Sequence, residues 1–365
     1  MTQLRVGVIG GGHLGRIHTK LLSQIDGVRV VAVCDPHPAA RQQAHQQFGV
    51  ETHADFRACA DGIDAAVIAA PTPDHAEIAK TLLKAGKHLF VEKPLASDAT
   101  DAQRLAMLAD ARRLTLQVGH VERFNPAFTS LDDLGVDVKY VEAVRASRFP
   151  GRCLDVGVVL DLMIHDLDLV LSMTDAAVTS VAASGLAVVT DHEDLAEARI
   201  EFACGLVANL KASRISPQPC REMRLFGSRG FAELDFSQPA LSVLRPCDTI
   251  AERSFELGRE TDSPTAYADQ LFAQRLRCQQ FELAPRNAIL DELHDWVISI
   301  QTGIAPTVDG AAGARAVMVA EQVLQAIERR RWYADASPSE IGPAAIAREG
   351  IESASRRAHR TRRAA

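Results

Sequence analysis

Three side chains in this sequence have the types and spacing that proton transfer requires. Asp161 and His165 are four residues apart, within an apolar-periodic stretch from Val158 to Ser172 that predicts a helix. Side chains four apart on a helix share one face. An imidazole titrates near neutral pH, and Lys93, which follows a short apolar strand, offers a cation that stabilises negative charge developing on an oxygen. Together these groups suit acid/base chemistry.

Each of these residues also has a simpler structural interpretation. A lysine before a proline is usually a solvated surface charge, and a histidine in an apolar helix is usually a hydrogen-bonded core residue. Asp166 and Asp168 follow His165 closely and compete with Asp161 as its partner. Three carboxylates near one imidazole suggest a metal site, but neighbouring residues on a helix face different directions, so we expect no metal.

A glycine-rich turn earlier in the sequence predicts a cofactor-binding site. The sequence Gly10-Gly11-Gly12-His13-Leu14-Gly15 follows a strand from Leu4 to Ile9 and opens an amphipathic helix. Gly10 allows the tight turn, Gly12 the approach of a pyrophosphate, and Gly15 close packing of helix on strand. The helix N-terminus favours anions. The residues expected to contact the phosphates are Gly10, Gly12, His13, Leu14 and Gly15.

The second strand ends at an acidic residue that distinguishes NAD from NADP. Asp35 lies twenty residues beyond Gly15, where a carboxylate accepts hydrogen bonds from ribose hydroxyls and repels a 2′-phosphate. Pro36 adds no positive charge. We therefore expect NAD, although Asp35 could instead only cap the strand-to-helix turn.

The first 122 residues alternate strands with helices, which predicts a Rossmann-type α/β domain with a doubly wound parallel sheet. Ligands gather beyond the carboxyl ends of such strands, and we expect Pro71, Thr72, His75, Glu92 and Lys93 to contact the cofactor there. The predicted strands are Leu4 to Ile9, Val28 to Val33, Asp64 to Ala70, His88 to Val91 and Thr115 to Val118. One predicted helix begins directly after Gly12. Two others span Asp74 to Ala85 and Asp98 to Arg112.

Residues 123–335 predict a second, α+β domain with an open, largely antiparallel sheet for substrate binding and oligomerisation. Its predicted strands are Val138 to Ser147, Val178 to Val189, Leu195 to Phe202, Leu206 to Arg214, Glu222 to Phe226 and Phe231 to Phe236. Its predicted helices are Val158 to Ser172, Ile289 to Gln301 and Ala311 to Arg329. Residues 336–365 are poor in apolar side chains and rich in arginine, which predicts a disordered basic tail.

Composition narrows the function classes. The net charge of −7 argues against nucleic-acid and anionic-membrane partners. Seven cysteines without a C-x-x-C pair suggest reduced, structural thiols. No signal peptide and no apolar run of membrane-spanning length is visible, so we expect a cytoplasmic protein without membrane insertion.

Taken together, these motifs resemble the Gfo/Idh/MocA oxidoreductases over about residues 1–333. The glycine turn, the triplet Glu92-Lys93-Pro94, and the hairpin Gly227-x-x-Gly230 followed by Asp235 carry the resemblance. The resemblance implies that Lys93 reaches the nicotinamide ribose and the substrate, and that His165 is the general base for a hydroxyl that loses hydride. Asp161 is implied to orient a substrate hydroxyl or the imidazole, and the chain to form dimers or tetramers.

Two stretches, Gly119 to Pro126 and Leu160 to Asp168, are similar to the UDP-sugar branch of that family. This similarity implies NAD-dependent oxidation at C3 of UDP-N-acetylglucosamine, giving a 3-keto sugar for 3-amino-sugar synthesis in lipid A or other surface polysaccharides. Asn125, Arg123 and Arg148 are the expected substrate contacts, since arginines bind diphosphates bidentately. Either arginine could equally be a surface ion-pair partner.

Other functions fit the same motifs. The substrate could be an inositol, a free hexose or UDP-N-acetylglucosaminuronate, although the uronate needs a further cation. A glycosidase that oxidises its substrate transiently with tightly held NAD is also compatible. A non-catalytic NAD-binding sensor is a different class, and the presence of both Lys93 and His165 counts against it.

Overall fold

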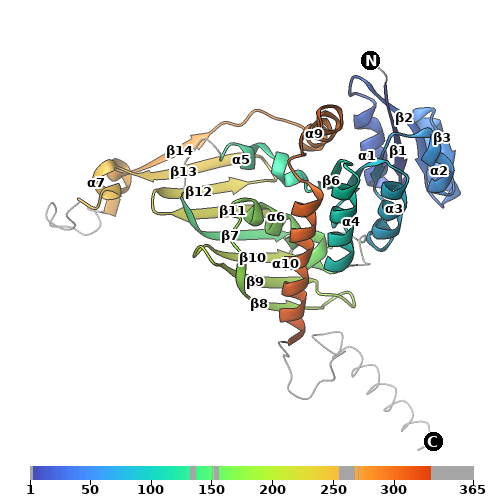
Figure 1. Ribbon diagram of the computed structural model, residues 1–365. Helices are drawn as coiled ribbons and strands as arrows, with labels where there is room; N and C mark the ends of the chain where they lie inside the picture. The colour runs from blue at the N-terminus through green and yellow to red at the C-terminus, as the bar shows by residue number, and fades with distance from the viewer. Residues whose placement is uncertain are drawn as a thin grey trace, which may run out of the picture.

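The computed structural model describes residues 3–131, 137–149, 151, 156–254, 268–269 and 271–329. In its first part, short apolar runs form a six-stranded parallel sheet in the order β3-β2-β1-β4-β5-β6, with helices on both faces (Figure 1). This is the predicted doubly wound sheet. The strands are β1 (Leu4–Ile9), β2 (Val28–Cys34), β3 (Glu51–His53), β4 (Ala65–Ile68), β5 (His88–Glu92) and β6 (Leu116–Gly119). The helices are α1 (His13–Leu22), α2 (Pro38–Phe48), α3 (Thr72–Lys84) and α4 (Ala99–Ala111).

Two elements of this domain were not predicted. Strand β3 is three residues long and lies at the sheet edge, where it pairs only with β2. Helix α2 buries a single side chain, Ala44. Helical periodicity is a pattern of buried apolar positions, so a helix that buries one alanine leaves almost no signal.

The second sheet is open and has eight strands in the order β14-β13-β12-β11-β7-β10-β9-β8. All pairs are antiparallel except β7 with β10, as the prediction of a largely antiparallel sheet requires. Strands β13 and β14 were not predicted. The strands are β7 (Val138–Ala146), β8 (Val178–Leu186), β9 (Leu195–Phe202), β10 (Val207–Ser213), β11 (Cys220–Gly227), β12 (Gly230–Asp235), β13 (Ala240–Pro246) and β14 (Leu276–Phe281).

The helix predicted from Val158 to Ser172 is not uniform. A π-helical turn, Val159–Met163, precedes the α-helix α6, Ile164–Ser172. The spacing between Asp161 and His165 therefore spans a change of helical pitch, and the simple i, i+4 relationship does not apply. Single π turns of this kind are frequent at functional sites.

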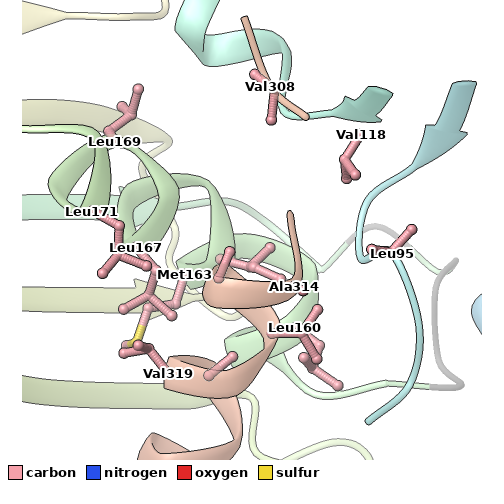
Figure 2. Packing of buried hydrophobic residues seen from close by; sticks show 14 of the residues in the cluster. Leu95, Val118, Leu160, Met163, Leu167, Leu169, Leu171, Val308, Ala314 and Val319 are labelled. Carbon is pink, nitrogen blue, oxygen red and sulfur yellow. The ribbon is translucent and has the colours of Figure 1, made fainter. Parts of the chain in front are cut away.

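An apolar core fixes this helix against both domains. Figure 2 shows side chains from the π turn and α6 packed beside α10 (Gly310–Arg329), with residues of the first domain close by. The labelled members of this cluster are Leu95, Val118, Leu160, Met163, Leu167, Leu169, Leu171, Val308, Ala314 and Val319. Because α6 contacts both halves of the molecule, the side chains that it carries are held at the domain junction.

Helix α9 (Ala288–Thr302) belongs by its packing to the first sheet, although its sequence lies within the range expected for the second domain. Trp296 is fully buried and meets Phe90 of β5 edge-on, with ring centroids 6.0 Å apart. Val6 and Val8 of β1 belong to the same core cluster. The chain thus returns to the Rossmann sheet after completing the second one.

Within the described residues, no helix combines the length and the apolar character that crossing a bilayer requires. Helix α5 (Pro126–Thr129) and helix α7 (Asp248–Ala251) are short connections beside the second sheet (Figure 1).

Trp296→Ala should lower the free energy of unfolding by about 3–5 kcal/mol, because it removes a large, fully buried side chain and leaves a cavity. Urea denaturation measures the change. Ile298→Ala on the same helix is the matched control, since Ile298 is 53% exposed and its loss should cost under ~0.5 kcal/mol. Equal effects of the two substitutions would contradict the placement of α9 in the first core.

Candidate active site

In the glycine turn after β1, the surrounding atoms leave no space for a side chain at Gly10 or at Gly15. Gly10 has a φ of +105°, and a Cβ there would lie 2.4 Å from the carbonyl oxygen of Ala69. A Cβ on Gly15 would lie 1.7 Å from the oxygen of Gly10. A Cβ on Gly12 would meet no atom within 4 Å, so the main chain at Gly12 faces open space at the start of α1. This cradle fits a pyrophosphate on the helix N-terminus.

Asp35 braces this turn from the end of β2. Its Oδ2 accepts a hydrogen bond from the Gly11 N–H at 2.8 Å, and its Oδ1 accepts one from the His37 N–H at 2.8 Å. The carboxylate is therefore buried beside the cradle, where it fixes the glycine turn and keeps negative charge at the ribose position expected for NAD.

The turn between β4 and α3 lies beside the cradle. Pro71 is the N-cap of α3 and Thr72 its first residue, at the carboxyl end of β4. The ring nitrogens of His75 lie 2.8 Å from the carbonyl oxygen of Pro94 and 2.9 Å from that of Ala70. His75 thus ties the Glu92-Lys93-Pro94 segment to the neighbouring loop, so it positions that segment rather than presenting a free imidazole.

At the end of β5, Glu92 and Lys93 make separate contacts. Glu92 Oε1 lies 2.6 Å from Nε2 of His18 on α1. Burial acts to raise the pKa of Glu92, but the hydrogen bond with His18 and the nearby positive charges hold that pKa below its ordinary value. Lys93 Nζ donates to the carbonyl oxygen of Asp161 at 2.7 Å and to its Oδ1 at 3.0 Å. Asp161 therefore pairs with Lys93.

His165 lies one turn beyond Asp161, with its Nδ1 buried and without a partner among the described residues. Burial lowers the pKa of His165 well below its ordinary value, and the positive charges of Lys93 and Arg145 lower it further. The ring is consequently neutral at neutral pH and able to accept a proton. Asp161 and His165, both among the described residues, make no hydrogen bond with each other. Asp161 therefore orients the Lys93 ammonium and not the imidazole.

A second imidazole, His120, lies edge-on to His165, with ring centroids 6.3 Å apart and an interplanar angle of 88°. His120 follows β6 directly. Sequence reasoning assigned it no role; its signal was its position at the carboxyl end of a strand next to β5.

The carboxylates after His165 are committed to buried arginines. Arg145 of β7 donates to Asp166 and, through Nη1, to Glu122 Oε1 at 2.6 Å. Burial raises the pKa of Asp166 in spite of Arg145. Asp168 accepts from Arg123 Nε at 2.7 Å and from its Nη2 at 3.2 Å. Neither aspartate is thereby left as a partner for His165.

The residues expected to bind the substrate are placed differently from one another. Arg123 is held in its ion pair with Asp168, and Asn125 uses its amide to cap α5 and to contact Glu122 and Phe236. These contacts give both residues a structural role, and their contact with the substrate stays a prediction. Arg148 is exposed and donates from Nε to the oxygen of Pro217 at 3.0 Å.

Arg221 of β11 is a cation that sequence reasoning missed. It is exposed, pairs in register with Arg145 across β11 and β7, and its charge contributes to the lowered pKa of His165. Because side chains at paired positions lie on the same face of a sheet, Arg221 projects on the side of the sheet that carries His165. Only the register of β11 against β7, which is a tertiary feature, reveals this position.

A cavity of about 700 Å³ is lined by residues that include Arg123, Phe128, Met173 and Leu225. Lys93, Asp161 and His165 are absent from its lining, so this hollow is separate from the catalytic cluster. Within the part of the chain that the structure describes, no group of three or more His, Cys, Asp or Glu side chains is placed to hold a metal ion.

Residues 4–120 match the oxidoreductase family with an NAD-binding Rossmann fold, and residues 137–233 match the GFO/IDH/MocA C-terminal domain. A UDP-N-acetylglucosamine 3-dehydrogenase of Acidithiobacillus ferrooxidans is 34% identical over 330 residues, which cover 90% of this chain and 98% of that protein. The chain belongs to the Gfo/Idh/MocA family. It is an NAD-binding oxidoreductase.

Solved structures and a further relative also resemble the chain. The solved structure of the Acidithiobacillus ferrooxidans enzyme has a TM-score of 0.78 at 33% identity and covers 90% of this chain and 99% of its own. A scyllo-inositol 2-dehydrogenase of Bacillus subtilis is 29% identical over 59% of this chain and 68% of its own length. Levoglucosan dehydrogenase in complex with NADH shares the fold, with a TM-score of 0.75 at 18% identity over 90% of this chain and 98% of its own.

Gly12→Ala should leave the free energy of unfolding within ~0.5 kcal/mol of wild type, because its Cβ meets open space. The same methyl group faces the expected pyrophosphate, so the dissociation constant for NADH, measured by fluorescence, should rise about tenfold. Gly15→Ala is the contrasting variant and should lose ~3 kcal/mol of stability through overlap with Gly10. Unchanged NADH affinity in Gly12→Ala would contradict this location for the phosphates.

The pH dependence of hydroxyl oxidation should have its acid limb below pH 6.5, the ordinary pKa of histidine. Because the folded-state pKa of His165 is lowered, its neutral form prevails above 6.5 and is lost only as the pH falls through the lowered value. Measurement of kcat/KM from pH 4.5 to 9 locates the limb, with NADH binding over the same range as the control for folding. A limb above pH 7 would contradict His165 as the base.

Proposed function

We propose that this enzyme oxidises the C3 hydroxyl of UDP-N-acetylglucosamine to the 3-keto sugar with NAD. The observation that carries the proposal is the Lys93 ammonium, held by Asp161 beside the neutral imidazole of His165 at the carboxyl edge of the Rossmann sheet. Similarity over nearly the whole length of a UDP-N-acetylglucosamine 3-dehydrogenase supports the substrate.

The residues divide the work as the chemistry requires. NAD, when bound on the glycine cradle, accepts the hydride. His165 takes the proton of the hydroxyl, because burial keeps its ring neutral. Lys93 stabilises the negative charge that develops on the oxygen, and Asp161 fixes the position of the ammonium through two contacts. His75 and Glu92 hold the segment that carries Lys93.

The diphosphate of the nucleotide needs cations outside the catalytic cluster. Arg221 and Arg148 are both exposed, and Arg221 lies on the face of the second sheet that carries His165, so we assign this role to them. Arg123 is already paired with Asp168, and withdrawal of its guanidinium would leave that buried carboxylate unpaired at a cost of several kcal/mol, so we assign the diphosphate to Arg221 and Arg148 first.

Inositol dehydrogenases are also among the relatives, at 25–29% identity, so inositol and free hexoses are the substrates to compare. A free polyol has no diphosphate, and its binding would be insensitive to Arg221. A 3-keto nucleotide sugar has to be consumed by a following enzyme, and an aminotransferase acting on the ketone is the reaction class that fits.

We also propose that the chain forms dimers or tetramers through the exposed face of its second sheet.

Purified protein incubated with NAD, UDP-N-acetylglucosamine, a 3-ketosugar aminotransferase and glutamate should form the 3-amino nucleotide sugar, detected by mass spectrometry. His165→Ala and Lys93→Ala should each lower kcat/KM about 10²–10³-fold, because one removes the base and the other the charge-stabilising cation. Arg221→Ala should raise KM about tenfold with little change in kcat.

A matched panel contains the uronate, myo-inositol and glucose. Turnover of a polyol with no turnover of the nucleotide sugar would contradict the proposed substrate. Wild-type rates in His165→Ala would contradict the proposed base. Net accumulation of NADH separates a dehydrogenase from a glycosidase that uses NAD only transiently.

A further inference from the structure

His120 differs from the other buried histidines of the first domain. Its side chain is 1% exposed, and neither ring nitrogen has a hydrogen-bond partner among the residues that the structure describes. His18 in contrast contacts Glu92 through Nε2, and only its Nδ1 lacks a partner among these residues, while both ring nitrogens of His75 lie at carbonyl oxygens. Burying an unpaired polar group costs about 1–3 kcal/mol. A ring that only filled space would be more stable as phenylalanine.

The backbone holds this ring firmly in place. The His120 N–H donates to the oxygen of Val118 at 2.7 Å, and the Arg123 N–H donates to the oxygen of His120 at 3.0 Å. The side chain is therefore set by a tight turn at the carboxyl end of β6, the strand beside the one that ends in Lys93.

The surroundings of His120 are those of the catalytic cluster. His165 lies edge-on at 6.3 Å, and its own Nδ1 is also buried and unpaired among the described residues. The charges that act on the His120 ring are Asp168, Arg123, Lys93 and Glu92. Asp168 and Arg123 pair with each other, Glu92 pairs with His18, and Lys93 pairs with Asp161, so all four charges have partners other than the His120 ring.

We propose that His120 binds the sugar directly, as a second imidazole that holds the polar substituent next to the carbon oxidised at His165. A neutral imidazole carries one N–H donor and one acceptor nitrogen. A sugar ring with hydroxyl or amide groups on neighbouring carbons offers matching partners. Two adjacent substituents of the sugar can therefore form hydrogen bonds with the two adjacent imidazoles. This inference rests on the proposed function and adds to it a residue that selects which ring hydroxyl faces His165.

The test compares two replacements of His120 in the full-length protein. His120→Phe keeps an aromatic ring edge against His165 and removes both nitrogens, whereas His120→Asn retains one donor and one acceptor. His45→Phe, on the exposed side of α2, is the control for loss of an imidazole elsewhere. The measurements are KM and kcat for the nucleotide sugar and the polyol panel, the dissociation constant for NADH, and the melting temperature without ligand.

In His120→Phe we expect KM for the sugar to rise at least tenfold and the NADH dissociation constant to stay within twofold. His120→Asn should recover part of the sugar affinity. The ligand-free melting temperature of His120→Phe should equal or exceed that of wild type, because an unpaired buried polar group is removed. A histidine with a purely structural role would instead destabilise the protein when replaced.

The proposal is overturned if His120→Phe turns over the sugar with KM within twofold of wild type, or if NADH affinity falls as much as sugar affinity. Failure of the proposed function is a separate result, in which wild type turns over no substrate of the panel. The ligand-free melting temperature still decides on His120 in that event, since a fall of more than about 3 °C in His120→Phe would show a ring that is needed for folding.

Discussion

The ion pair between Lys93 and Asp161 is the interaction on which the rest of this structure depends. Lys93 directly follows strand β5 of the Rossmann sheet, and Asp161 lies in the π turn that precedes α6 in the second domain. The ammonium is therefore placed by one domain and oriented by the other. The reacting groups meet only if the two domains are packed in a fixed relation, so the packing at their junction has a catalytic consequence.

Two kinds of contact maintain that relation. The apolar cluster around α6 and α10 joins residues from both domains, as Figure 2 shows for Leu95, Met163 and Ala314. Beneath it, Arg145 connects Asp166 of α6 to Glu122 of the first domain's last connection. Buried ion pairs add little net stability compared with apolar packing, yet breaking one is costly. Their geometry fixes the direction in which α6 presents His165, while the apolar cluster supplies the free energy.

Local motifs were predictable from the sequence, whereas relations across the chain were not. The glycine turn was recognised because its steric demands act between Gly10, Gly15 and the adjoining strand, all within a few residues or one strand crossing. The pairing of Asp161 with Lys93, 68 residues away, depends on the π turn, which has no sequence signature of its own. Arg123 was expected to bind phosphate, but its type alone cannot distinguish a ligand contact from the buried partner Asp168 that the fold provides.

The distribution of unsatisfied polar groups separates support from function in this site. Asp35, His75 and Asn125 have their polar atoms engaged, and each of them braces a turn that holds other residues. Among the described residues near Lys93, both ring nitrogens of His120 and the Nδ1 atoms of His165 and His18 are buried without partners, and His18 is anchored to Glu92 through its Nε2. The free-energy cost of an unpaired buried polar group is offset when a ligand forms the missing hydrogen bonds. A preorganised group of this kind needs no rearrangement when the substrate binds. The hydrogen bonds of the first group thus support the fold, whereas the unpaired nitrogens of His120 and His165 are the ones that our proposals assign to the sugar.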